Sequence, residues 1–134
     1  MSVSNQLQGA IYTALTSDTE LMADISGVFD AVPDNYDQFP YVTIGEDVLT
    51  EWDTDNGTGY TASITIHTWS RATGRKEAKG IQGLIYDTLH NTPLPMTGYT
   101  MILIKQESEN TLLDPDGKTR HGVQTFNSII TRNN

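Results

Sequence analysis

One stretch of alternating residues constrains the fold of this chain more than any other feature. Between Tyr60 and Trp69, apolar and polar side chains take turns, with Tyr60, Ala62, Ile64 and Ile66 set against Thr61, Ser63, Thr65 and His67. A period of two is typical of a β-strand with one buried face. A second run of strand formers, Tyr41–Ile44, precedes it. We therefore predict that the two runs pair as a long antiparallel hairpin.

The segment between these two runs predicts the tip of the hairpin. Residues from Glu51 to Gly59 are mostly polar, and Asn56-Gly57 supplies the backbone torsions that a tight turn demands. Because turn residues outnumber apolar anchors there, we expect a flexible loop, as we do for Glu109–Lys118. A solvated tip accounts for the carboxylates more simply than a cation site does. These acidic residues are Glu46, Asp47, Glu51, Asp53 and Asp55.

Two amphipathic helices are predicted from apolar residues at helical spacing. The first runs from Val3 to Leu15, and the second, principal helix runs from about Thr73 to His90. Between them, Ser17-Asp18-Thr19-Glu20 has the sequence of a capping box, with Ser17 as the N-cap. It predicts a short additional helix that ends at Gly27.

Three further strands complete the expected order of elements. They are a brief strand at Val28–Val32 and two longer ones at Tyr99–Glu107 and Arg120–Thr131, joined by the turn Asp114-Pro115-Asp116-Gly117. Paired strands with helices between the pairs predict an α+β fold, an antiparallel sheet with two main helices packed on one face. A length of 134 residues suits a single domain spanning 1–134.

The overall charge excludes one large class of partners. Eight basic and seventeen acidic side chains give a net charge of -9, and such a field repels phosphate backbones. We therefore expect no tight binding of nucleic acid. No apolar run approaches the roughly 20 residues that span a bilayer, so no membrane partner is expected either.

The sequence carries no recognised catalytic or metal-binding motif. We therefore predict that the protein is not an enzyme and holds no cofactor or metal. There is no cysteine, no Gly-x-Ser-x-Gly elbow and no phosphate-binding loop. The three histidines lack the spacing of a zinc motif. A metal-dependent hydrolase using Asp114, Asp116 and His121 is an alternative with an incomplete ligand set, which metal analysis would test.

Several short stretches, taken together, carry a family resemblance over most of the chain. They are Ala10–Tyr12, Asp30–Pro33, Phe39–Glu46, Thr65–Arg71, Gly74–Ala78 and Asp114–Val123. In this order they resemble the phage tail-completion family, which includes tail terminators and tail-to-head joining proteins. The resemblance implies no catalytic residue.

The resemblance also implies a place in a virion assembled in the host cytoplasm. Its members are α+β subunits that form a ring, usually of six, at the head-proximal end of the tail. The expected partners are other copies of the chain, the tail tube protein and the neck or head-completion proteins. DNA would pass through the lumen without tight binding. An adaptor elsewhere, in the neck or baseplate, is the alternative, and gene order would discriminate between them.

Two sets of residues are candidates for these contacts. Helical spacing gathers the first set on the outer face of the principal helix, where two glycines forgo about 2 kcal/mol of helix stability and so predict a groove for a neighbouring subunit. The alternative is that this helix face is merely solvated and that the two glycines arose by neutral drift. The second set lies in the predicted loops and is expected to contact tube or neck. The helix set is Lys76, Lys79, Gly80, Gly83 and Tyr86, and the loop set is Glu51, Trp52, Asp53, Asp55, Asp114 and Asp116.

The basic residues near the start of the principal helix leave three readings open. Arg71, Arg75, Lys76 and Lys79 hold half of the basic charge within nine residues. They could form a phosphate patch, a solvated helix start, or a contact with an acidic neighbour. The net charge of the chain disfavours the phosphate patch.

Overall fold

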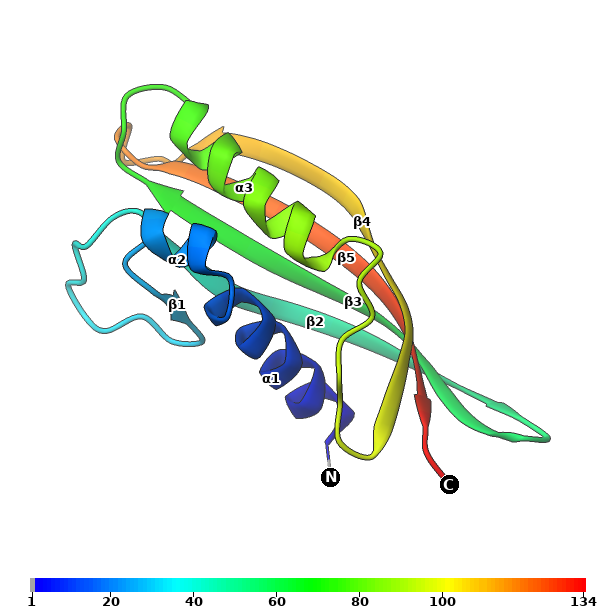
Figure 1. The fold of residues 1–134 in the computed structure, drawn as a ribbon. Helices are drawn as coiled ribbons and strands as arrows, with labels where there is room; N and C mark the ends of the chain where they lie inside the picture. The colour runs from blue at the N-terminus through cyan, green and yellow to red at the C-terminus, as the bar shows by residue number, and fades with distance from the viewer. Residues whose placement is uncertain (1) are drawn as a thin grey trace.

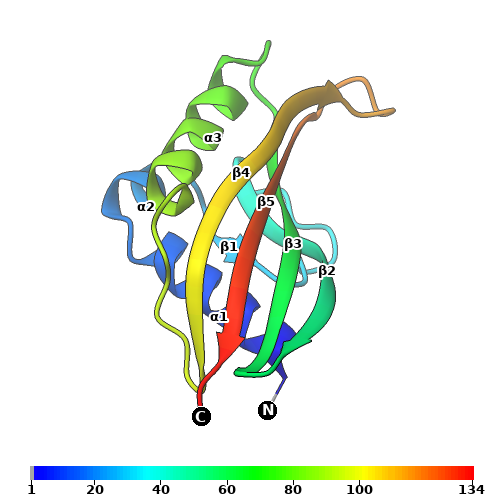
Figure 2. The same ribbon diagram turned by 90° about the vertical axis from the view of Figure 1, so that its right-hand side faces the viewer.

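A twisted five-stranded sheet with all three helices on one face forms the body of the protein (Figures 1 and 2). The computed structural model describes residues 2–134. The strand order is β1-β2-β3-β5-β4, with every pair antiparallel except β1 and β2. This confirms the predicted α+β fold. The elements are α1 (Val3–Thr16), α2 (Thr19–Asp24), β1 (Val28–Phe29), β2 (Tyr41–Thr54), β3 (Gly57–Ser70), α3 (Lys76–Leu89), β4 (Tyr99–Leu113) and β5 (Arg120–Arg132).

The hydrophobic core lies between the helices and one face of the sheet. Alternate residues of β3 and β5 point into it, as the period of two predicts, and both main helices bury one stripe of side chains against them. The opposite face of the sheet carries no helix (Figure 2). The largest fully buried side chains are Phe126, Leu7, Ile11, Leu15, Leu21, Ile64, Ile66, Ile85, Leu89, Ile104 and Ile130.

The hairpin of β2 and β3 is longer than the sequence predicted. Pairing continues to Thr54 opposite Gly57, so most of Glu51–Gly59 is strand, and the prediction of a loop there was wrong. That this segment is flexible stays a prediction. The last part of the hairpin projects beyond the helices as an arm (Figure 1). Both faces of a two-stranded arm can meet water, so polar residues do not end the strands. β4 likewise runs on to Leu113 rather than ending at Glu107, because it stays paired with β5 as far as Arg120.

Local corrections concern the short elements after α1. Asp18, not Ser17, is the N-cap of α2, because its carboxylate accepts hydrogen bonds from the backbone N–H groups of Glu20 and Leu21 at 3.1 and 3.2 Å. Ser17 instead ends α1, and α2 stops at Asp24 rather than Gly27. The strand predicted at 28–32 is only the two residues of β1, because the chain then leaves the edge of the sheet.

A buried network of glutamines joins α3 to the sheet. Gln82 and Gln124 are fully buried. The Gln82 side chain donates to the backbone oxygen of Asn110 at 3.0 Å, and Gln124 donates to the Gln82 backbone and to the Gln106 side chain, both at 2.9 Å. Gly122 lies directly beneath this network. The absence of a side chain there lets α3 approach β5 closely.

We predict that Gly122→Ala destabilises the fold. The added methyl group would lie 2.6 Å from Nε2 of Gln82 and 3.2 Å from Cβ of Thr68, so the amide must move and lose its bond to Asn110. The expected loss is about 1–3 kcal/mol in the free energy of unfolding, measured by urea denaturation. Gly9→Ala is the control, since its methyl group meets open space in α1 and should stabilise by up to about 1 kcal/mol. Equal stability of both variants would contradict the packing argument.

Candidate interaction surfaces

The outer face of α3 carries all five helix residues that the sequence singled out. Ala78, Ile81 and Ile85 are buried against the sheet, which turns Lys76, Lys79 and the two glycines outward. A methyl group built on Gly80 or on Gly83 would meet nothing within 4 Å. At these two positions, one turn of the helix apart, another chain could come close to the backbone of α3.

Tyr86 stands at the far end of this face and is 37% exposed. Its ring stacks on His90, with centroids 4.4 Å apart and planes within 16°. Nδ1 of His90 in turn accepts the backbone N–H of Gln106 at 3.0 Å. Tyr86 thus packs on a neighbouring ring while remaining partly exposed, and tyrosine is among the residues enriched at the energetic centres of interfaces.

Two hollows flank the ridge of α3. The hollow on the side of α2, about 510 Å³, is lined by Asp24, Ala72, Thr73, Lys76, Glu77, Gly80 and Ile81. The hollow on the side of β4, about 540 Å³, is lined by Arg75, Lys79, Glu109, Asn110 and Thr111. The cations Arg75, Lys76 and Lys79 are exposed and form no ion pair with any residue from 2 to 134.

The arm of β2 and β3 presents acidic side chains and one tryptophan. Glu51, Asp53 and Asp55 are exposed and have no ion pair within the described chain. Trp52 lies across the backbone of Gly59, where an added methyl group would come within 2.2 Å of the indole ring. The tryptophan is therefore packed on its own hairpin.

The turn between β4 and β5 is held by its own carboxylates. Oδ1 of Asp116 accepts the backbone N–H groups of Lys118 and Thr119 at 2.8 and 2.9 Å, and Oδ2 accepts the Thr119 hydroxyl at 2.6 Å. These bonds, with Arg71 nearby, lower the pKa of Asp116 to about 2. Asp114 lies 3.4 Å from Nδ1 of His121. Of the predicted loop Glu109–Lys118, residues 109–113 belong to β4, and the turn that follows is held by these side-chain hydrogen bonds.

A chain of four titratable side chains crosses the uncovered face of the sheet. Glu46 lies 3.1 Å from Nε2 of His67, Nδ1 of His67 lies 2.6 Å from Nε2 of His121, and His121 contacts Asp114. A proton must lie between the two inner nitrogens, because two lone pairs would repel at this distance.

The sequence did not predict the meeting of His67 and His121. They lie 54 residues apart, and the signal that brings them together is the register of β3 and β5, which sets Trp69 opposite His121 and His67 opposite Val123. Trp69 stacks on His121 with ring centroids 3.9 Å apart. Among residues 2–134, no three or more such side chains are arranged to hold a metal ion. Of the hydrolase set, Asp114 reaches His121, but Asp116 is bonded within its own turn.

Acidification should weaken the fold through His121. Burial lowers the pKa of His121, and the nearby His67 lowers it further, against a smaller opposing effect of Asp114. The neutral imidazole is thus favoured in the folded state, so its stabilisation is present above the unfolded value of about 6.5 and is lost as the pH falls through the lower folded value. Urea denaturation from pH 8 to 5 measures this slope. His121→Gln should flatten it, and an unchanged slope would contradict the assignment.

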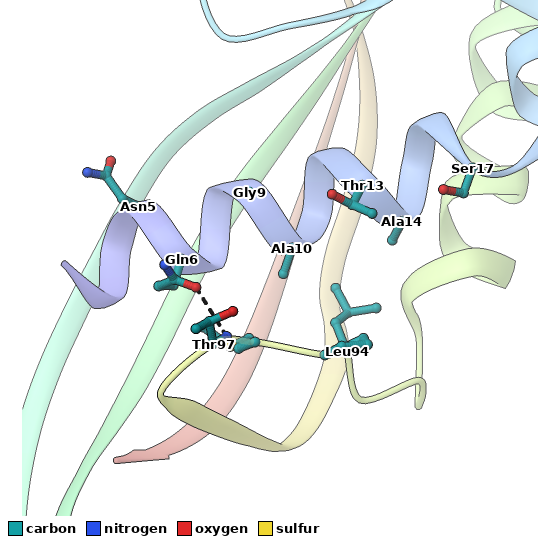
Figure 3. Close-up of a pocket in the computed structure, with 11 residues that line it drawn as sticks. Asn5, Gln6, Gly9, Ala10, Thr13, Ala14, Ser17, Leu94 and Thr97 are labelled. Carbon is teal, nitrogen blue, oxygen red and sulfur yellow. Dashed lines mark hydrogen bonds between the residues drawn. The ribbon is translucent and has the colours of Figure 1, made fainter. Parts of the chain in front are cut away.

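A third hollow lies between α1 and the segment before β4 (Figure 3). It measures about 380 Å³ and has small side chains of α1 on one wall, with Leu94, Pro95 and Met96 on the other. The side-chain oxygen of Gln6 accepts the backbone N–H of Thr97 at 3.2 Å and closes one end. Nothing in its lining resembles a catalytic constellation. Separately, no helix between residues 2 and 134 is both long and apolar enough to cross a membrane.

Comparison with known proteins identifies the family. The family model for tail completion protein gp17 matches residues 9–131. The tail completion protein gp17 of Bacillus phage SPP1 is 31% identical over 130 residues, which cover 97% of this chain and 96% of that protein. The chain belongs to the tail completion protein gp17 family. Members of this family are structural components of phage tails and not enzymes, so the hydrolase alternative falls away.

Solved structures agree with this membership. The structure of bacteriophage SPP1 gp17 protein superposes with a TM-score of 0.57 at 27% identity, covering 98% of this chain and 91% of that one. A chain in the virion of a native gene transfer agent particle superposes with a TM-score of 0.90, covering 97% and 98%. At 22% identity the second likeness establishes the shared fold. As a tail completion protein, the chain is a virion component of the tail.

Proposed function

We propose that this tail completion protein acts as a ring of about six subunits that caps the head-proximal end of the tail tube. The ring stops growth of the tube and then joins the tail to the head or neck. The observation that carries the proposal is the family match over residues 9–131, nearly the whole chain. A net charge of -9 fits a conduit through which DNA slides without sticking.

The outer face of α3 is the proposed contact between subunits. Gly80 and Gly83 leave the helix backbone open, and the hollows on either side of the ridge give a neighbouring chain room to lie close. We call the open strip of helix surface at Gly80 and Gly83 the groove. Lys76 and Lys79 lie on either side of it as partners for an acidic edge, and Tyr86 lies at its far end as an aromatic anchor.

The proposed contact with tube or neck uses the turn that carries Asp114 and Asp116. This turn and the tip of the β2–β3 arm lie at opposite ends of the sheet (Figure 1), so one partner of ordinary size would not cover both. The order that Asp116 gives the turn lowers the entropy lost on binding.

Elongation of tail tubes in vitro tests this function. Purified tube subunits of the same particle are allowed to polymerise, and the full-length protein is then added before a second batch of tube subunits. We expect the tubes to stop lengthening, because the open end is capped. Tubes that keep growing at the same rate with the protein bound at their ends would overturn the capping role. Heat-denatured protein is the control for non-specific inhibition.

A further inference from the structure

Two sets of opposite charge lie at opposite ends of the molecule. Each holds three side chains that form no ion pair with any residue from 2 to 134, Glu51, Asp53 and Asp55 at one end and Arg75, Lys76 and Lys79 at the other. The acidic arm, defined as residues 46–58, carries five carboxylates and no lysine or arginine. The basic entry of α3, defined as Arg75, Lys76 and Lys79, lies at the other end of β3, where the chain leaves the sheet for the helix (Figure 1). Since one chain cannot bring its two ends together, these charges cannot neutralise each other within a subunit.

We propose that the tip of the acidic arm of one subunit docks in the groove beside the basic entry of α3 in the next subunit. The occupant of the groove is therefore a second copy of this chain. Contacts between unlike patches at opposite ends repeat head to tail, and such contacts close into a ring when the rotation permits. The inference rests on the proposed ring and names the two surfaces that meet in it.

The backbone of the arm gives a second, independent reason for a partner. β1 pairs only with Val42 and Thr43, so no described strand pairs with the outward edge of β2 from Gly45 to Thr54. Unpaired edges are sites for contact with another chain. On the receiving side, Gly80 and Gly83 allow a backbone to come close to α3, and Asn110 and Thr111 line the hollow next to Lys79.

The other edge of the sheet is formed by β4, and its backbone is largely bonded to the chain around it. The outward edge of β2 in the arm is therefore the edge left for a partner. The backbone oxygen of Ile104 in β4 accepts the N–H of Asn91, and Gln106 N–H donates to His90. Asn110 accepts from Gln82, and Pro95 forms a bridge with Thr100. The α3–β4 connection therefore protects β4 against edge-to-edge pairing.

Neighbouring charges modify this complementarity but do not reverse it. Beside the basic entry, Glu77 accepts the Ser70 hydroxyl at 2.7 Å, while Asp24 and Glu109 line the two hollows. Beside the tip of the arm, Arg132 lines a hollow with Trp52 and Thr58, and its guanidinium donates to the Tyr60 hydroxyl. Of the three carboxylates beside the basic entry, Glu77 is engaged inside its own subunit, while Asp24 and Glu109 line the hollows. The three cations of the entry form no ion pair with any residue from 2 to 134 and so are free for a neighbour.

Charge reversal tests the pairing. The arm variant is Glu51→Lys, Asp53→Lys and Asp55→Lys, and the entry variant is Arg75→Glu, Lys76→Glu and Lys79→Glu. Each full-length protein is supplied to particles assembled without the gene, and joined particles are counted by electron microscopy. Each variant alone should give more than about tenfold fewer joined particles, because like charges face each other in every contact. Supplied together, the two should restore joining, since alternating subunits again pair opposite charges.

The controls separate this inference from folding and from the proposed function. The matched control variant carries Asp30→Lys, Asp34→Lys and Asp37→Lys. It changes the net charge by the same amount as the arm variant does, but in the loop between β1 and β2, and it should join particles normally. Urea denaturation checks that each variant folds, and glutamate near the start of a helix is favourable. If the arm variant fails and the entry variant works, or if the mixture is no better than either, the pairing is overturned while the ring stands. If the unaltered protein released from virions gives no assembly larger than a dimer, the proposed function fails instead.

Discussion

Particles assembled without this protein are expected to have filled heads that remain unjoined to tails, and tails of irregular and often excessive length. The reason is that nothing then caps the growing tube or offers a surface to the neck. Electron microscopy of lysates from a deletion strain measures both the joining and the distribution of tail lengths. The infectious or transducing titre should fall with the fraction of joined particles.

Complementation supplies the control for this prediction. The unaltered protein expressed in the same strain should restore a narrow distribution of tail lengths. Normal, functional particles from the deletion strain would contradict a role in completing the tail. Tails of normal length that merely remain unjoined would contradict the capping role and leave only the joining role.

Gly83→Leu is expected to leave the subunit folded and to abolish ring formation or tail joining. A Cβ atom added at Gly83 meets nothing within 4 Å in its own subunit, so on this proposal the rest of the leucine side chain would extend into the space that the neighbouring chain requires. Overfilling a packed contact costs about 1–3 kcal/mol, a factor of about 5 to 150 in affinity for each contact in the ring. Native mass measurement and the counting of joined particles give the readout, with urea denaturation as the check on folding.

Gly83→Ala is the matched variant and should impair assembly only mildly. On helix propensity alone, it should raise the stability of the isolated subunit by up to about 1 kcal/mol. If both variants assemble normally and are more stable than the parent, then the outer face of α3 is merely solvated and the contact between subunits lies elsewhere.

The long-range order of the fold was predictable because its sequence signals are local and repeated. Alternation from Tyr60 to Trp69 predicted the central strand, and apolar spacing predicted both main helices. The length of the arm was not predictable, since Asp53 and Thr58 pair as strand residues without burying an apolar face. Polarity is a sign of exposure, and in this hairpin exposure and strand structure occur together.

The candidate surfaces were predictable to different degrees. Helical spacing alone placed Lys76, Gly80 and Gly83 on one outward face, and the structure agrees. The contact of His67 with His121 was not predictable, because it depends on the register between two strands far apart in the sequence. Register is fixed by the packing of the whole sheet, so no local pattern reveals it.

The native mass of the protein, measured both free in solution and after release from virions, tests the central claim most directly. One chain has a mass of 14.8 kDa. The account predicts a monomer or a closed ring in solution. From virions it predicts a ring of about six chains, with a total mass of about 89 kDa. A stable dimer and nothing larger, found in both preparations, would contradict the ring.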